Sequence, residues 1–338
     1  MRLSPRRSAV LFSTFLSLLV LSPAHAEEGA RERIERMVEA MRESNFEGVY
    51  VHVRSESIES MEVVHAFDGD HEIERLTALN GEIREVIRDD DTCRCTWPNQ
   101  KTVVEGRFPG ARARISAERF SKPELLQENY RIMSVGRDRV AGRYCDLIAL
   151  VPKDDLRFGY KLCIDSEHDL MLRMSVFDES GMAVEHNFFT RLEVSDQLLD
   201  AQARASRFDT EGFEIVRSGA ANPHEAAESN DEELAASAPQ WAIDPLPTGY
   251  VLKEHVRRSN PVTGNAFEHY AFTDGLSTIS VFVEPAEGQS IENPRLRMSH
   301  AVHTQTRTVG DHRVTVIGEA PQQVVEMFCE SVRPVTDE

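Results

Sequence analysis

Two pairs of cysteines carry the most distinctive chemistry in this sequence. Cys93 and Cys95 are two residues apart, so in a strand both thiols lie on one face, about 7 Å apart at the ideal strand rise. They could share a soft metal ion or pair with other cysteines. A metal would need further ligands, and the neighbouring sequence supplies none. We expect incidental or disulfide-forming cysteines and leave their role open.

Cys145 and Cys163 are the better-placed pair. If a hairpin is centred on Asp154, these two cysteines stand opposite one another across it. A disulfide closing that loop would add on the order of 3 kcal/mol. The alternative is two small buried side chains. Cys329, on a predicted helix, is expected in the core.

Histidines and carboxylates form no clear ligand set. His52, His65 and His71 lie on neighbouring predicted strands, but no cysteine or carboxylate stands at metal-ligand spacing beside them. We expect exposed strand histidines, and the pair His300 and His303 is equally weak. The acidic run 85–91 lacks the glycine and closing glutamate of a calcium loop, so it predicts a solvated hairpin end. We expect no metal and no other cofactor.

Catalytic motifs are absent from the sequence. It contains no G-x-S-x-G elbow, no phosphate-cradling glycine loop, no dinucleotide fingerprint and no H-E-x-x-H. We therefore expect that the protein is not an enzyme and has no catalytic residues. A hydrolase would need a nucleophile and a base that the sequence does not indicate.

A local basic and aromatic group marks a candidate partner-binding surface. Arginine and aromatic side chains are enriched in protein interfaces. The alternative is ordinary edge-strand residues. The candidates are Arg257, Arg258, Phe267, His269 and Tyr270.

Periodicity predicts the elements that position these groups. Residues 29–44 have apolar side chains at helical spacing, and from Asn45 onward the period changes to two. Short strands follow, separated by turns such as Asn80-Gly81, a strong hairpin signal. Consecutive hairpins predict an antiparallel sheet with one apolar face.

The segment 144–176 shows that apolar face most clearly. A hairpin centred on Asp154 pairs Ile148 with Tyr160 and Leu150 with Phe158, and a third strand continues the alternation. These positions are candidates for a lipid cavity, with packing on the domain's own helices as the alternative. The candidates are Ile148, Leu150, Phe158, Tyr160, Leu162 and Met174.

The first residues predict export. A basic start, an apolar stretch from Ala9 to Leu21 and a small-x-small site ending at Ala26 are typical of a secretory signal peptide. A retained membrane anchor is the alternative. Cleavage removes three arginines and no acid, so the net charge of −19 becomes −22. That charge opposes binding to nucleic acid or anionic headgroups, and we expect a soluble exported protein.

Composition divides the mature chain in two. Residues 217–239 are rich in Ala, Ser, Asn, Asp and Glu, which predicts a flexible linker, with a folded acidic loop as the alternative. Strands and a closing helix over 321–332 follow. The expected boundaries are a signal peptide at 1–26, a large domain at 27–213, a linker at 214–240 and a small domain at 241–338.

An ordered set of segments resembles one known family. The stretch 134–148 (SVGRDRVAGRYCDLI) continues through 158–160, 164–167 and 178–181, and the second unit adds 246–250, 273–277, 308–310 and 314–319. Together they are similar to the RseB/MucB family of sigma-E regulatory proteins. The resemblance covers nearly the whole mature chain.

The resemblance implies an α+β fold of two domains. The large N-terminal domain would be an unclosed antiparallel β-barrel with helices, like the lipoprotein carriers LolA and LppX, and the smaller C-terminal domain would be α/β. Together they would grip the periplasmic part of a membrane anti-sigma factor similar to RseA or MucA. The bound protein would shield that factor from regulated proteolysis, and a lipid or lipopolysaccharide-like signal would release it.

Two functions follow as hypotheses. The first is a negative regulator of the envelope-stress response, and the alternative is a periplasmic carrier or chaperone for lipids or lipoproteins. An apolar cup would gain about 0.8 kcal/mol per buried methylene of an acyl chain. The second domain favours regulation, because a simple carrier needs only the cup. The oligomeric state, including a homodimer, is left open.

Overall fold

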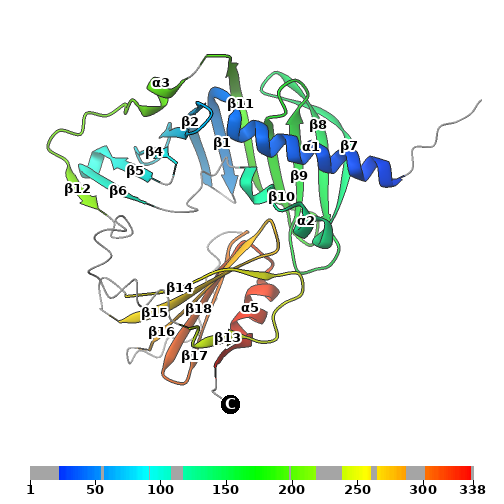
Figure 1. Ribbon diagram of the computed structural model, residues 1–338, viewed down its shortest axis with the longest axis vertical. Helices are drawn as coiled ribbons and strands as arrows, with labels where there is room; N and C mark the ends of the chain where they lie inside the picture. The colour runs from blue at the N-terminus through cyan, green and yellow to red at the C-terminus, as the bar shows by residue number, and fades with distance from the viewer. Residues whose placement is uncertain are drawn as a thin grey trace, which may run out of the picture.

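The computed structural model describes residues 23–54, 57–90, 92–107, 117–197, 199–217, 238–259, 265–286 and 301–335. Most of the predicted linker therefore lies outside the described residues, as does most of the predicted signal peptide. Two sheets dominate, a large one in the first half of the chain and a smaller one in the second (Figure 1).

The large sheet has twelve strands that form two meanders joined in the middle. Its strand order is β12-β6-β5-β4-β3-β2-β1-β11-β10-β9-β8-β7. The first meander runs β1 Asn45–Arg54, β2 Ser57–Phe67, β3 Glu72–Ala78, β4 Glu85–Asp89, β5 Thr92–Trp97 and β6 Thr102–Arg107. The second runs β7 Tyr130–Val140, β8 Arg143–Pro152, β9 Gly159–Asp165, β10 Met171–Phe177 and β11 Ala183–Ser195. Antiparallel pairing of β1 with β11 joins the two.

The sheet ends later in the chain than the predicted boundary. Strand β12, Glu214–Arg217, pairs parallel with β6 and so carries the large sheet to Arg217. The end strands β12 and β7 are not neighbours, so the sheet is unclosed. Four short helices complete this half: η1 Pro98–Gln100, η2 Ala117–Phe120, α2 Pro123–Asn129 and α3 Asp200–Arg204.

Helix α1, Pro23–Glu43, runs across one face of the large sheet (Figure 1). It starts before residue 27, the predicted first residue of the mature chain. Its buried side chains follow helical spacing, as the sequence predicts, and pack into the main core. Those side chains are Ala30, Ile34, Met37 and Met41.

The small domain is a five-stranded antiparallel sheet with one helix. The strand order is β14-β15-β16-β18-β17, with β14 Val251–Ser259, β15 Ala266–Thr273, β16 Thr278–Pro285, β17 His303–Val309 and β18 His312–Gly318. Helix α5, Gln322–Ser331, packs on it through Val324, Val325 and Phe328. β13 Trp241–Ile243 pairs with β19 Val332–Pro334. These features confirm the expected fold class, an unclosed antiparallel sheet with helices followed by a smaller domain of sheet and helix.

Within the described residues, no helix combines the length and the apolar character needed to cross a membrane.

Candidate functional site

The predicted cavity residues lie in the main hydrophobic core. All six are at most 3% exposed, and they share one cluster with the inner side chains of α1. Their shared face was predicted correctly, but the face is covered by the chain's own helix. A lipid that used this face would have to displace α1. The six are Ile148, Leu150, Phe158, Tyr160, Leu162 and Met174.

The predicted register of the β8–β9 hairpin is wrong by two residues. Ile148 pairs with Leu162, and Leu150 pairs with Tyr160. The connection is longer than a turn centred on Asp154, because Pro152 cannot donate to the ladder and Arg157 is held outside it. A shift of two leaves every side chain on its predicted face, since the side-chain period of a strand is two.

Cys145 and Cys163 form a disulfide with a Cα–Cα distance of 5.3 Å. In the observed register Cys145 pairs with Asp165 and Leu147 pairs with Cys163. The two cysteines are therefore diagonal neighbours rather than directly opposite. Both side chains are fully buried and belong to the main hydrophobic cluster.

The histidines that were expected to be exposed are mostly buried. His52 is 5% and His65 is 1% exposed. A ring nitrogen of His52 contacts the Asn187 side chain. The two ring nitrogens of His65 contact the Ser44 carbonyl and the Glu72 carboxylate, so both buried rings keep hydrogen-bond partners.

The remaining metal candidates give no site. His303 is buried with Nδ1 2.8 Å from the Ala320 carbonyl, while His300 lies outside the described residues. In the acidic run 85–91, Glu85 is buried and accepts a hydrogen bond from the Arg207 backbone, so it is not part of a solvated hairpin end. Over the described part of the chain, no group of three or more His, Cys, Asp or Glu side chains could hold a metal ion.

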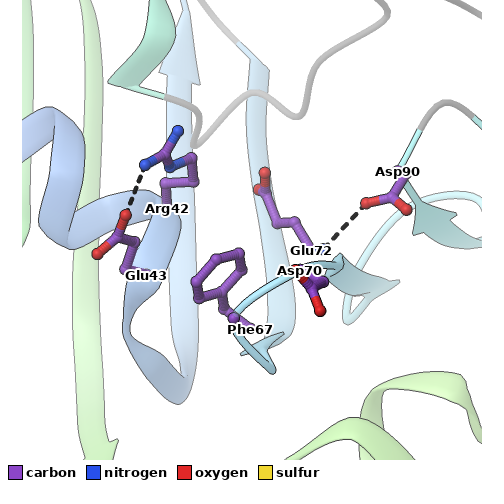
Figure 2. Close-up of a pocket in the computed structure, with 7 residues that line it drawn as sticks. Arg42, Glu43, Phe67, Asp70, Glu72 and Asp90 are labelled. Carbon is purple, nitrogen blue, oxygen red and sulfur yellow. Dashed lines mark hydrogen bonds and ion pairs between the residues drawn. The ribbon is translucent and has the colours of Figure 1, made fainter.

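An open pocket of about 510 Å³ lies at the C-terminal end of α1, and Figure 2 shows residues that line it. Arg42 forms an ion pair with Glu43, and the Glu72 backbone donates to Asp90 Oδ1 at 3.0 Å. Most of the lining is acidic, so the pocket suits neither an acyl chain nor an anion. The lining residues are Arg42, Glu43, Phe67, Gly69, Asp70, Glu72 and Asp90.

The partner-binding candidates are split between the two faces of the small sheet. Phe267 and His269 are half-buried on one face, where His269 stacks on Phe282 with ring centroids 4.5 Å apart. Tyr270 is buried on the opposite face, and its hydroxyl bonds Glu268.

The two arginines divide in the same way. Arg257 pairs with Glu268 and so shares its face, whereas the Arg258 backbone pairs with Phe267. The side chain of Arg258 lies outside the described part of the structure. The structure therefore brings together Phe267 and His269, with Phe282, and separates them from Arg257 and Tyr270.

A buried polar junction between the two domains was not predicted from the sequence. Arg157, in the β8–β9 connection, has a fully buried side chain whose Nη1 lies 3.3 Å from Asp274 Oδ2 of the small domain. Its Nε donates to Asp154 at 2.8 Å, and its Nη2 donates to the Thr248 carbonyl at 2.9 Å. Burial lowers the pKa of Arg157, but the bond to Asp154 and the charge of Asp274 outweigh it and raise the pKa.

Asp274 organises the junction from the small-domain side. Its Oδ2 accepts a hydrogen bond from the Tyr130 hydroxyl at 3.0 Å, and its Oδ1 accepts one from the Ser277 backbone at 2.8 Å. Asn129 Nδ2 donates to the carbonyls of Asp274 at 2.8 Å and Gly249 at 3.1 Å. Burial, and then the charge of Asp274, hold the pKa of Tyr130 well above its ordinary value, so this phenol stays a proton donor.

Glu319 makes a second link between the domains. It follows β18, and its carboxylate lies 3.0 Å from Arg54 Nη2 and 3.4 Å from Arg119 Nη2 of the large domain. Burial raises the pKa of Glu319, but the two arginines outweigh burial and lower it. The same Arg54 guanidinium also bonds Glu185 at 2.8 Å.

The junction brings together segments that are far apart in the chain. Residues 158–160, 246–250 and 273–277 all carry the family resemblance, and each contributes to the junction or borders it. The Asp-Gly turn at 274–275 could have pointed to a special role for Asp274. Nothing in the sequence distinguishes Arg157 from a surface arginine, because its partners are far away in the chain.

Comparison with known proteins agrees with this architecture. The model of the MucB/RseB N-terminal domain matches residues 29–207, and that of the MucB/RseB C-terminal domain matches residues 235–333. The sigma factor AlgU regulatory protein MucB of Pseudomonas aeruginosa is 30% identical over 323 residues, which cover 94% of this chain and 95% of that protein. The sigma-E factor regulatory protein RseB of Haemophilus influenzae is 26% identical, with 94% and 96% covered.

Solved structures agree as well. A crystal structure of MucB in complex with MucA(peri) has a TM-score of 0.70 at 26% identity and covers 91% of this chain and 100% of that one. A crystal structure of MucB has a TM-score of 0.61 at 24% identity, which shows the shared fold. Both domains are thus matched in order over nearly the whole chain, and the protein belongs to the MucB/RseB family.

Proposed function

We propose that this protein is a periplasmic regulator that binds the periplasmic part of a membrane anti-sigma factor. The observation that carries the proposal is the match over both domains to MucB, which has been crystallised in complex with MucA(peri). Binding the factor would shield it from regulated proteolysis and so keep the envelope-stress response off. The protein would act through contacts and not through catalysis.

The half-buried aromatic patch of Phe267, His269 and Phe282 supports a docking role for the small domain. Exposed aromatic side chains are enriched at protein interfaces and often carry much of the binding energy. The buried junction supports joint action of the two domains, because Arg157 and Asp274 hold them in one arrangement.

A lipid or lipopolysaccharide-like molecule would act as the releasing signal. It can do so only by binding the free form better than the bound form. Because α1 fills the apolar face of the large sheet, the signal would enter by moving that helix. Displacing α1 would shift β7, and β7 begins at Tyr130, whose hydroxyl donates to Asp274. Moving the helix would therefore disturb the junction.

A binding titration tests the proposal. The full-length chain is titrated with the periplasmic segment of its own anti-sigma factor, followed by calorimetry. We expect binding, at least tenfold weaker for Phe267→Ser and unchanged for Tyr144→Ser. Tyr144 is a matched control because this aromatic residue is 71% exposed but lies on β8 of the large domain. Failure of the unmodified chain to bind would sink the regulatory function.

The lipid step has its own test. Lipopolysaccharide fragments are added to the preformed complex, and release of the anti-sigma segment is measured. Release is expected, and it should be lost when α1 is fixed by a cross-link to the sheet. Lipid binding to a chain that never binds the anti-sigma segment would favour the carrier function.

A further inference from the structure

The two cysteines of β5 are in contact with each other and lie apart from the domain junction. Cys93 Sγ and Cys95 Sγ are 3.6 Å apart, and neither is in a disulfide. Both side chains are half-buried, so small reagents can reach them. The intervening Arg94 bonds Thr210 Oγ1 at 2.9 Å.

The strand pairing places charged groups beside the thiols. Cys93 pairs with Arg88 of β4, which in turn pairs with Glu74 of β3. Arg88 forms an ion pair with Glu74 at 3.3 Å. Cys95 pairs with Val86 of β4. The positive charge of Arg84 favours the thiolate of Cys95.

This environment makes the two thiols unequal. A hydrogen bond from Cys93 lowers the pKa of Cys95 to about 7, with burial opposing and Arg84 assisting. The same hydrogen bond, followed by burial, raises the pKa of Cys93. An accessible thiolate next to a protonated thiol is the arrangement found at cysteines that are oxidised reversibly, with one attacking sulfur and one resolving sulfur.

We propose that Cys93 and Cys95 form an oxidation site in which Cys95 reacts with a hydroperoxide and Cys93 closes a disulfide within the strand. The Cys95 thiolate attacks one peroxide oxygen, so an S–O bond forms, the O–O bond breaks, and the leaving oxygen takes a proton to give an alcohol or water. The Cys93 sulfur then attacks Cys95, so the S–S bond forms and hydroxide leaves as water with the Cys93 proton. The two thiols lose two electrons, and the hydroperoxide gains them.

Strand geometry suits a reversible bond. Residues two apart in a strand have Cα atoms roughly 6.4–6.8 Å apart, at the upper end of the range that a disulfide spans. Closing the bond therefore requires β5 to pleat more strongly between β4 and β6. A disulfide strained in this way is easily reduced, which distinguishes a labile site from a structural cross-link.

The test uses hydrogen peroxide at pH about 7 on the full-length chain, with Cys93 and Cys95 as free thiols and the Cys145–Cys163 disulfide intact, followed by alkylation and peptide mapping. In the unmodified chain, the peptide containing both cysteines should lose two hydrogen atoms and become resistant to alkylation. Cys329 is an internal control, because burial raises its pKa to about 11 and should leave it unoxidised. If the peptide with Cys93 and Cys95 stays fully alkylatable under peroxide, the proposal is overturned.

Two serine variants assign the roles. Cys93→Ser should accumulate a sulfenic acid on Cys95 that dimedone traps, because the resolving thiol is gone. Cys95→Ser should react more slowly, because burial still raises the pKa of Cys93 above its ordinary value after the Cys95 thiol has been removed. Equal rates in the two variants, with circular dichroism showing both folded, would refute the assigned order.

Discussion

The guanidinium of Arg157 lies 3.3 Å from the carboxylate of Asp274, and neither side chain is exposed to solvent. One residue belongs to the large domain and the other to the small domain. A buried ion pair tolerates little change, because removing one partner leaves an uncompensated charge. The pair therefore couples the folding and the orientation of the two domains.

The first prediction concerns that pair. Asp274→Ala should lower the free energy of unfolding by about 3 kcal/mol, near the low end for a broken buried pair because Asp154 still faces Arg157. Trp97 in the large domain and Trp241 in the small domain report the domains separately. We expect their urea transitions, read in single-tryptophan versions, to separate in the variant.

The control for this variant is Glu193→Ala, which breaks an exposed ion pair with Arg191. Exposed pairs contribute less than about 1 kcal/mol. If Asp274→Ala costs no more than this control, the junction does not couple the domains.

The second prediction concerns the close approach at Gly249. Its φ is +80°, and an added Cβ would meet Asn129 Oδ1 and lie 2.7 Å from Arg157 Nη2. Gly249→Ala should therefore combine left-handed strain of about 1–2 kcal/mol with an overpacking cost of about 1–3 kcal/mol. Thermal unfolding measures the total.

Gly212→Ala separates the two effects. Gly212 has a similar φ of +76° but has nothing within 4 Å of an added Cβ. It should show the strain alone. Equal losses in the two variants would mean that crowding at the junction contributes nothing.

Periodicity was enough to predict the sheet and the helix that covers it. The change of period at Asn45 predicted where helix α1 gives way to β1, and the apolar face of the second meander contains the residues that were expected there. Period-two alternation identifies the face of a residue but not its partner, so the two-residue error in the β8–β9 register left the face correct.

The remaining errors come from contacts that are distant in the chain. His52 is buried because Asn187, on a strand 135 residues away, gives its ring a partner. Arg157 is buried because Asp274 lies 117 residues away. A single sequence shows neither partner, so both residues look like ordinary surface positions.

The third prediction concerns the disulfide. Cys145 and Cys163 are separated by 18 residues, so opening their bond should cost about 3 kcal/mol in the loop-entropy estimate. Urea unfolding with and without a reductant measures the difference. The double variant Cys145→Ala/Cys163→Ala should show no response to the reductant. A response as large in that variant as in the unmodified chain would assign the effect to other thiols.

The fourth prediction concerns pH and Glu319. Because Arg119 and Arg54 lower the pKa of this carboxyl below its ordinary value of 4.5, the folded protein binds its proton less readily than the unfolded chain does. Glu319 therefore contributes its full stability at pH values above 4.5. That contribution is lost as the pH falls through the lowered pKa of the folded state. Unfolding midpoints measured from neutral pH down into that window should fall less steeply for Glu319→Gln than for the unmodified chain.

Glu211→Gln, at an exposed turn before β12, should leave the profile unchanged. Parallel profiles for the Glu319 variant and the unmodified chain would show that this link between the domains does not respond to acid.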